Sequence, residues 1–309
     1  MFPSPAGGRR GSGSAHNFRR APLALMYEKH FGFAERPFSL NPDPAFLYRG
    51  RKHGMAAAML EYGLLNDAPM IVISGEIGSG KTTLIRHLLN QLDATTTVGL
   101  ISNTHKAFGE LIQWVCVAFG LEHEGKDKVT LYRRFMDFLI HEYAKGKRTV
   151  LIVDEAQNMD TDTLEELRLI SNINADKNLV LQLILVGQPE LRATLHQPRM
   201  EQFAQRIAVD YHLEALELKE TREYIQHRLR VAGGNKNLFL PDAILAVFQH
   251  AAGVPRLINS LCDSALVYAY AEGRLRVTGK IVNELVAEKK AKGLFGAGKI
   301  DYDKPIILS

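Results

Sequence analysis

The chain has 309 residues, of which 46% are hydrophobic and 23% are charged, and its net charge at pH 7 is +4. These values are typical of a soluble globular protein with one to three domains. No apolar run approaches the length of a membrane span. With only two cysteines, Cys116 and Cys262, we do not expect a disulfide framework, and a reducing cytoplasm is favoured.

The positive charge is concentrated at the N-terminus. Residues 1–25 contain four of the 38 basic residues and none of the 34 acidic ones, so the rest of the chain holds 34 of each. This Gly-, Ser- and Pro-rich stretch has too little apolar surface to fold alone. We interpret it as a disordered basic tail, or as a stretch upstream of a functional start at Met26. The neutral remainder weighs against nucleic-acid binding unless basic side chains cluster.

Residues 26–68 have a different pattern. Prolines alternate with aromatic side chains, and a helix is predicted at about 52–65. The residues that form this pattern are Phe31, Phe33, Pro37, Phe38, Pro42, Pro44, Phe46 and Tyr48. The prolines favour extended chain, so we expect this segment to pack its aromatic side chains onto a neighbouring surface.

The segment Gly75–Thr82 matches the phosphate-binding pattern G-x-x-x-x-G-K-[ST]. An apolar strand predicted at 70–74 precedes it and a helix predicted at 83–89 follows, which is the context that the motif requires. Lys81 is predicted to reach the β- and γ-phosphates, and Thr82 to ligate Mg²⁺. The predicted nucleotide-binding residues of this loop are Gly75, Glu76, Ile77, Gly78, Ser79, Gly80, Lys81, Thr82 and Thr83.

Apolar strands and helices alternate up to residue 213, and only helices follow. Further strands are predicted at 97–102, 149–154, 180–186 and 207–213, with helices at 107–119 and 129–145 and another that Asp162 opens, with Glu165 three residues on as in a capping box. This order predicts an α/β fold with a parallel sheet covered on both faces.

Later helices are predicted near 218–232, 241–252, 255–272 and 279–290. We therefore predict a tail at 1–25, an N-terminal segment at 26–68, a nucleotide-binding core at 69–213, a helical lid at 214–290 and a tail at 291–309.

The third predicted strand ends in Asp154-Glu155. Ligands of open α/β sheets bind at the carboxyl edge of the strands, where these two carboxylates would lie. Asp154 is predicted to hold Mg²⁺ and Glu155 to act as general base toward water. The alternative is that the pair only caps the following helix.

Two amide side chains follow other strands. Gln188 is predicted to sense the γ-phosphate, unless it is only a turn residue before Pro189. Asn103 would be able to contact Glu155 and keep it inactive until a partner binds. An ordinary asparagine at a strand end is the alternative.

Two arginines are candidates to complete the site. Arg206 would act as an arginine finger on the nucleotide of a neighbouring subunit, with Arg199 and Arg192 as rivals. Arg256, which begins a lid helix, would contact the nucleotide of its own chain. For each of them the alternative is a solvated surface charge.

Eight short motifs together resemble those of the general secretion pathway protein A (ExeA-type) family of AAA+ ATPases. The resemblance covers about Met26 to Val286. The first seven of these motifs lie at 26–33, 36–38, 41–44, 75–83, 153–157, 187–191 and 205–207, and an eighth follows at Gly253-Val254-Pro255-Arg256-Leu257-Ile258-Asn259. The resemblance implies a P-loop NTPase of the AAA+ (ASCE) type, with a five-stranded parallel sheet in the order 5-1-4-3-2 and a C-terminal helical lid. It also implies ATP and Mg²⁺ as cofactors and activity as a homo-oligomer.

Members of the family serve in secretion, pilus assembly and exopolysaccharide loci. This chain lacks the membrane helix and the peptidoglycan-binding domain of the secretion prototype, so we expect a short cytoplasmic form. We expect an ATP hydrolase that acts as an oligomerising switch or assembly factor with a protein partner in secretion or envelope assembly. The alternatives are a DNA-binding regulator similar to the transposition ATPases, or a kinase with the same loop.

Overall fold

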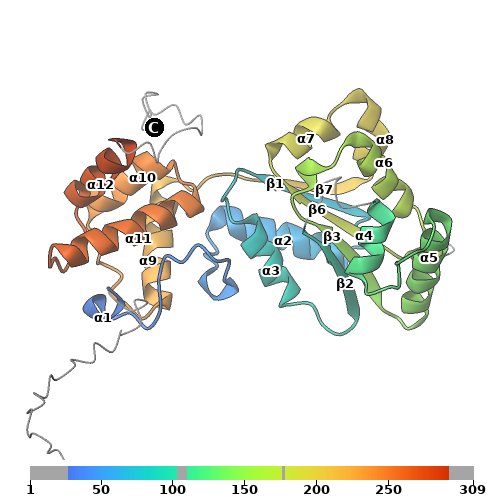
Figure 1. Cartoon of the computed structure of the whole chain (residues 1–309), viewed down its shortest axis with the longest axis horizontal. Helices are drawn as coiled ribbons and strands as arrows, with labels where there is room; N and C mark the ends of the chain where they lie inside the picture. The colour runs from blue at the N-terminus through green and yellow to red at the C-terminus, as the bar shows by residue number, and fades with distance from the viewer. Residues whose placement is uncertain (1–26, 103–109, 176–177, 292–309) are drawn as a thin grey trace, which may run out of the picture.

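The computed structural model describes residues 27–102, 110–175 and 178–291, which form an α/β lobe and a helical lobe (Figure 1). Asn103 and the two predicted tails lie outside the described residues. The α/β lobe contains α2 (Arg51–Leu65), β1 (Met70–Gly75), α3 (Lys81–Leu89), β2 (Thr96–Ile101), α4 (Leu111–Ala118), α5 (Lys128–Ala144), β3 (Arg148–Val153), η4 (Ala156–Asn158), α6 (Thr161–Ile170), β4 (Asn174–Ala175), β5 (Asn178–Leu179), β6 (Gln182–Gly187), α7 (Pro189–Leu195), η5 (Pro198–Met200), α8 (Glu201–Ala204) and β7 (Ile207–Leu213). The helical lobe contains α9 (Leu218–Val231), α10 (Pro241–Ala251), α11 (Pro255–Ala271) and α12 (Gly279–Ala291), together with the N-terminal α1 (Glu28–Phe31) and η2 (Pro44–Phe46).

The main sheet has five parallel strands in the order β2-β3-β6-β1-β7. When only these five strands are numbered along the chain, this order is 5-1-4-3-2, as predicted. The short antiparallel pair β4 and β5 forms a separate two-stranded sheet, which sequence analysis missed. Two residues per strand are too few to give a periodic pattern.

Alternate side chains of the central strands enter two separate cores. Met70 and Val72 pack with α4, α5 and α6 on one face, whereas Ile71 and Ile73 pack with α2 and α3 on the other. Because both faces are covered, the strands appear in the sequence as continuous apolar runs. Figure 1 shows α2 and α3 together on one side of the sheet.

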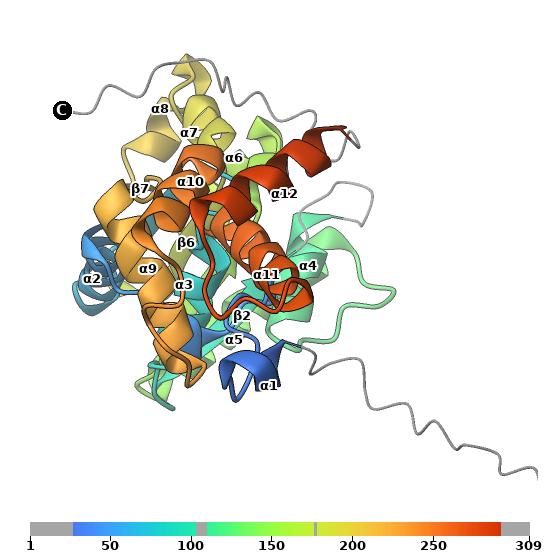
Figure 2. The ribbon, with the colours of Figure 1, turned by 90° about the vertical axis from the view of Figure 1, so that its left-hand side faces the viewer.

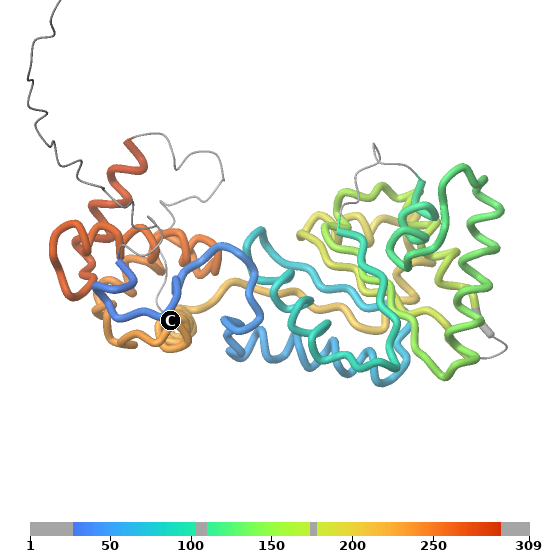
Figure 3. The backbone as a smooth tube through the Cα atoms, turned by 60° about the horizontal axis from the view of Figure 1, so that its bottom comes forward, coloured from blue at the N-terminus to red at the C-terminus, as the bar shows by residue number. Residues whose placement is uncertain are grey.

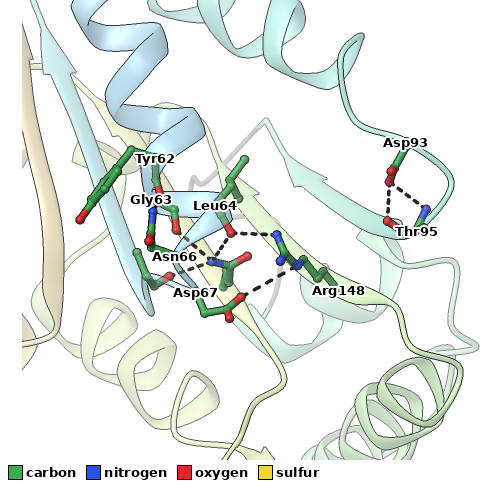
Figure 4. Close-up of polar contacts among 10 residues, drawn as sticks. Tyr62, Gly63, Leu64, Asn66, Asp67, Asp93, Thr95 and Arg148 are labelled. Carbon is green, nitrogen blue, oxygen red and sulfur yellow. Dashed lines mark hydrogen bonds and ion pairs between the residues drawn. The ribbon is translucent and has the colours of Figure 1, made fainter.

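Polar contacts fix the turn that leads from α2 into β1 (Figure 4). The Gln182 amide donates to the carbonyl oxygens of Gly63, Leu64 and Ala68 at 3.2–3.4 Å. Arg148 donates to Leu64 O at 3.1 Å and lies 3.9 Å from the Asp67 carboxylate. These contacts satisfy the last carbonyls of α2, which have no partner within the helix.

The N-terminal strap, residues 27–48, packs onto the helical lobe. In Figure 3 it runs from that lobe to α2, and Figure 2 shows α1 beside the lid helices. Four of its aromatic side chains belong to the hydrophobic core that α9–α12 form, and these are Tyr27, Phe33, Phe38 and Phe46. Helix α2 instead packs in the α/β core. The segment 26–68 therefore contributes to both lobes.

The backbone packs closely within the helical lobe at Gly253, just before α11, where it meets Leu216 of the same core. A Cβ at this position would lie 1.9 Å from the carbonyl oxygen of Leu216, and φ is +73°. The Leu216 N–H donates to Gly253 O at 2.9 Å. Only glycine allows this backbone approach.

Two predicted helix starts differ from the structure. Helix α6 is capped by Asp160, whose carboxylate accepts the Thr163 N–H, so Asp162 lies in the first turn. The capping pattern was therefore placed two residues too late. Helix α3 begins at Lys81 rather than at residue 83, because the loop curls directly into the helix at Gly80.

Candidate active site

The phosphate-binding loop connects β1 to α3 and is shaped by two left-handed glycines. Gly78 and Gly80 have φ values of +82° and +103°, which glycine adopts without strain. The Lys81 ammonium is buried and donates to the carbonyl oxygens of Gly75 at 2.7 Å and Glu76 at 3.0 Å. The loop is therefore folded around its own lysine.

Asp154 follows β3 and faces this loop. Its carboxylate accepts the Thr82 hydroxyl at 3.2 Å and the Glu155 N–H at 2.9 Å. The strands end at one edge because β1 and β3 both flank β6 in parallel register. Burial is the main cause that raises the pKa of Asp154 above its ordinary value, and the Glu155 N–H opposes this effect.

The opposite charge of Lys81 lies in the same buried region. Burial lowers the pKa of Lys81, and the nearby carboxylates of Glu155 and Asp154 oppose that change. The site therefore brings together one buried cation, the buried Asp154 carboxyl group and the half-buried Glu155 carboxyl group. Such groups interact more strongly there than at an exposed surface.

Gln188 and a residue that sequence analysis missed, Gln157, hold the Glu155 carboxylate. Glu155 Oε2 accepts from Gln157 Nε2 at 2.7 Å and from Gln188 Nε2 at 3.2 Å. The Gln188 N–H donates back to Gln157 Oε1 at 3.0 Å. Gln157 was seen only as a letter of a motif, because nothing in the sequence indicates where its amide points.

The site opens into a cavity of about 370 Å³. On the phosphate side it is lined by Ile77, Gly78, Gly80, Lys81, Thr82, Thr83, Glu155 and Gln188. The strap side is lined by residues 39–43 and 46–48 of the N-terminal strap and by the lid residues Tyr224, Arg228, Pro255, Arg256 and Asn259. Except for Arg256, sequence analysis assigned no residue of the strap side to the site.

Arg228 fastens the strap to the lid. Its buried guanidinium donates to Pro37 O at 2.6 Å, to the Tyr224 hydroxyl at 2.9 Å and to Ser39 O at 3.3 Å, and lies 4.8 Å from the centre of the Phe46 ring. The Tyr224 hydroxyl donates in turn to Asn259 Oδ1 at 2.8 Å. This network stabilises the strap side of the cavity.

Two further residues contact the phosphate loop from outside it. The Arg256 N–H donates to Gly78 O at 3.1 Å, and a Cβ on Gly78 would lie 2.5 Å from Arg256 Cβ. On the other side the buried His53 of α2 donates through Nε2 to Ser79 O at 2.9 Å. Burial is the main cause that lowers the pKa of His53. The lid and α2 thus both fix the loop backbone.

The arginine-finger candidates lie elsewhere. Arg206 precedes Ile207, which pairs with Met70 at the start of β1. Arg206 therefore lies at the end of the strands opposite to Gly75. Its guanidinium donates to Ser171 O at 3.0 Å. Arg192 is paired with Asp210 at 2.8 Å, and Arg199 is exposed.

The residues present fit a nucleoside triphosphate with Mg²⁺. The curled loop at the start of α3 directs backbone N–H groups toward one place, as anion sites at helix N-termini do. Thr82 and Asp154, 3.2 Å apart, offer a hydroxyl and a carboxylate, which are ligands that Mg²⁺ accepts alongside phosphates and water.

Residues 65–195 match the family model of the AAA domain. The fold of this chain resembles that of the ORC2 protein of Aeropyrum pernix, with a TM-score of 0.61 and 20% identity, over 82% of this chain and 71% of that protein. The fold also resembles that of Cdc6p of Pyrobaculum aerophilum, with a TM-score of 0.59 and 17% identity, over 85% of this chain and 72% of that protein. At these identities the likeness concerns the fold alone. Together with the sheet order and the loop, these findings define a P-loop protein of the AAA+ class.

Within this class the chain is related to a secretion protein. It is 41% identical over 254 residues to General secretion pathway protein A of Aeromonas hydrophila, which covers 82% of this chain and 46% of that protein. The predicted resemblance to this family is therefore confirmed. The chain spans about half the length of this curated relative.

Among the described residues, no helix is both long and apolar enough to cross a membrane.

Proposed function

We propose that this chain is a Mg²⁺-dependent ATP hydrolase that acts as an oligomerising switch or assembly factor in the cytoplasm, with a protein partner in secretion or exopolysaccharide export. The observation that carries the hydrolase assignment is the position of Glu155. Its carboxylate follows Asp154 at the same sheet edge as the phosphate loop and is held by Gln157 and Gln188. A carboxylate placed there suits water, whereas a kinase would need an acceptor site in addition.

Each residue has a defined task in this proposal. The loop N–H groups and Lys81 hold the phosphates, and Thr82 and Asp154 hold the metal ion, which supplies charge neutralisation between phosphate oxygens. Glu155 accepts the proton of the attacking water. Gln188, whose amide touches the Glu155 carboxylate, links that base to the end of β6.

The position of Arg206 supports the proposed oligomerisation. This side chain lies at the opposite sheet edge from the loop of its own chain. As an arginine finger it would therefore serve a neighbouring subunit, and Arg199 is the rival. Arg256 completes the site within the chain, because its backbone is joined to Gly78.

The relationship to General secretion pathway protein A supports a role in secretion or envelope assembly. Two basic side chains of α5 are already paired with carboxylates, which weighs against the DNA-binding alternative. Lys128 pairs with Glu166 at 2.8 Å, and Arg134 pairs with Glu122 at 2.6 Å. These cations already have carboxylate partners, so they form no free basic face for phosphates.

The decisive experiment replaces the base. We expect Glu155→Gln to bind ATP like the wild type and to hydrolyse it about 10²–10⁴-fold more slowly, since a positioned general base contributes that factor. The control is Glu124→Gln, an exposed carboxylate between α4 and α5, which should keep wild-type turnover. Unchanged turnover in Glu155→Gln would remove Glu155 from the mechanism.

The same trapped variant tests the assembly. Its mass with ATP is measured by light scattering, with and without duplex DNA at two salt concentrations. An ATP-dependent oligomer that forms without DNA supports the proposal. A filament that needs DNA and weakens steeply with salt would instead support the DNA-binding alternative.

A further inference from the structure

The Gln157 side chain joins the loop after β3 to the end of β6. Its amide nitrogen donates to Glu155 Oε2 at 2.7 Å, and its amide oxygen accepts the Gln188 N–H at 3.0 Å. Gln188 Nε2 also donates to Glu155 Oε2 at 3.2 Å. The three residues thus form a closed ring of hydrogen bonds in which each one contacts the other two.

The surrounding backbone is built to keep this ring closed. Glu155 has the left-handed conformation, with φ of +55° and ψ of +35°, which costs energy for a residue with a Cβ. On the other side, a Cβ on Gly187 would lie 3.0 Å from Gln157 Oε1 and 2.8 Å from the Leu191 side chain. Glycine at 187 is what allows the Gln157 amide to reach the end of β6.

Glutamine suits this position because the ring needs one donor and one acceptor on the same side chain. A carboxylate of equal length offers no donor when ionised, and methionine offers at most a weak acceptor. An exposed amide one residue on, Asn158, makes no such bridge. The hydrogen bonds therefore distinguish Gln157 from its neighbour of similar chemistry.

We infer that Gln157 is a positioning residue for the hydrolysis of ATP, which fixes the Glu155 carboxylate and couples its orientation to Gln188 and β6. This inference rests on the proposed function. If a bound γ-phosphate displaces Gln188, the direct hydrogen bond from Gln188 to Glu155 changes. The hydrogen bond from the Gln188 N–H to Gln157 changes as well, and Gln157 in turn contacts Glu155. Glu155 is thus connected to Gln188 by two routes, one through their direct hydrogen bond and one through the side chain of Gln157.

The test compares Gln157→Glu with Asn158→Asp, which makes the same amide-to-carboxylate change at the exposed neighbour. The rate of a single ATP turnover and the nucleotide affinity are measured separately. In Gln157→Glu we expect the turnover rate to fall about tenfold or more, with little change in affinity, because the ionised side chain cannot donate to Glu155. Asn158→Asp should match the wild type in rate and affinity.

A second variant secures the test against misfolding. Gln157→Met keeps the length of the side chain but cannot donate to Glu155, and thermal unfolding shows whether each variant is folded. A folded Gln157→Met with about tenfold slower turnover and unchanged affinity supports the inference. Wild-type turnover in the folded Gln157→Glu and Gln157→Met variants would overturn it.

The outcome for Glu155→Gln keeps this inference apart from the proposed function. If Glu155→Gln loses hydrolysis while the Gln157 variants behave as the wild type, only the positioning role fails. If Glu155→Gln hydrolyses at the wild-type rate, the general-base assignment fails first.

Discussion

The phosphate side and the strap side of the cavity differ in how far apart in the sequence their residues lie. On the phosphate side, β1 leads directly into the loop and α3, and Asp154 and Glu155 come from a neighbouring strand of the same sheet. On the strap side, residues 39–48 meet Arg228, which follows them by about 180 positions or more. The first side is a local motif on a rigid sheet. The second exists only when two distant segments have met.

The two sides also use different chemistry. Charged and hydroxyl side chains converge on the phosphate side, where Lys81 and Asp154 are both buried. The strap side is fixed by one guanidinium that binds main-chain carbonyls and a tyrosine hydroxyl. Mutations should therefore affect mainly ligand chemistry on one side and mainly stability on the other.

The largest effect on stability is expected from Arg228→Ala. It leaves the buried Pro37 carbonyl without its partner and removes three hydrogen bonds from a charged donor, so the free energy of unfolding should fall by about 3 kcal/mol. Chemical denaturation measures this value, and nucleotide affinity should fall as the strap detaches. Arg230→Ala, an exposed arginine on the same helix, should stay within about 0.5 kcal/mol of the wild type. Equal stability of the two variants would contradict the importance given to the strap.

A smaller effect of opposite sign is expected on the phosphate side. Burial raises the pKa of Asp154 above the ordinary value of 3.8, so its carboxylate costs stability once the pH rises above that value. Asp154→Asn should therefore unfold a few degrees higher than the wild type at pH 7.5 without nucleotide, by roughly 1 kcal/mol for a chain of this size. Thermal unfolding from pH 7.5 to pH 4 checks this, and the difference should shrink as the pH approaches 3.8.

The same variant should bind Mg²⁺ and ATP more weakly, because it loses a carboxylate ligand. A gain in stability together with a loss of ligand binding would mark Asp154 as a residue kept for function at the expense of stability. An Asp154→Asn variant that is less stable than the wild type at pH 7.5 would contradict this account.

The smallest effect is expected at His53, which lies beneath the phosphate loop. Because burial lowers its pKa below the ordinary 6.5, the unfolded chain takes up the proton first as the pH falls. The stability that neutral His53 contributes is thus present above pH 6.5 and declines below it. His53→Gln, which can still donate to Ser79 O, should flatten the dependence of melting temperature on pH between about 6.5 and 5, with a change below about 1 kcal/mol. An unchanged slope would contradict a folded pKa of His53 that lies below its unfolded value.

The phosphate side was predicted from the sequence, and the strap side was not. The loop, Asp154 and Glu155 follow apolar strands, and parallel register brings strand ends to one edge. Gln188 was predicted at a strand end for the same reason, and the structure places its amide 3.2 Å from Glu155. Its role as a sensor stays a prediction.

Arg228 was missed because a guanidinium that binds carbonyl oxygens needs no particular residue type as its partner. In the sequence it looks like any other arginine of an amphipathic helix. Gln157 was missed for a related reason, since the direction of a side-chain amide depends on the left-handed backbone at Glu155. Pairings of this kind are properties of the folded chain and leave no spacing pattern.

The strap has a consequence for the order in which the protein is made. Pro37 leaves the ribosome early, whereas Arg228 follows it by 191 residues. Contacts between such distant residues form late, because closing a long loop costs entropy before any contact is gained. The α/β sheet and its phosphate loop are complete in the nascent chain once β7 has emerged, but the cavity is not. Its remaining wall is assembled only after the lid helices have been synthesised, so a closed site marks a chain that has finished folding.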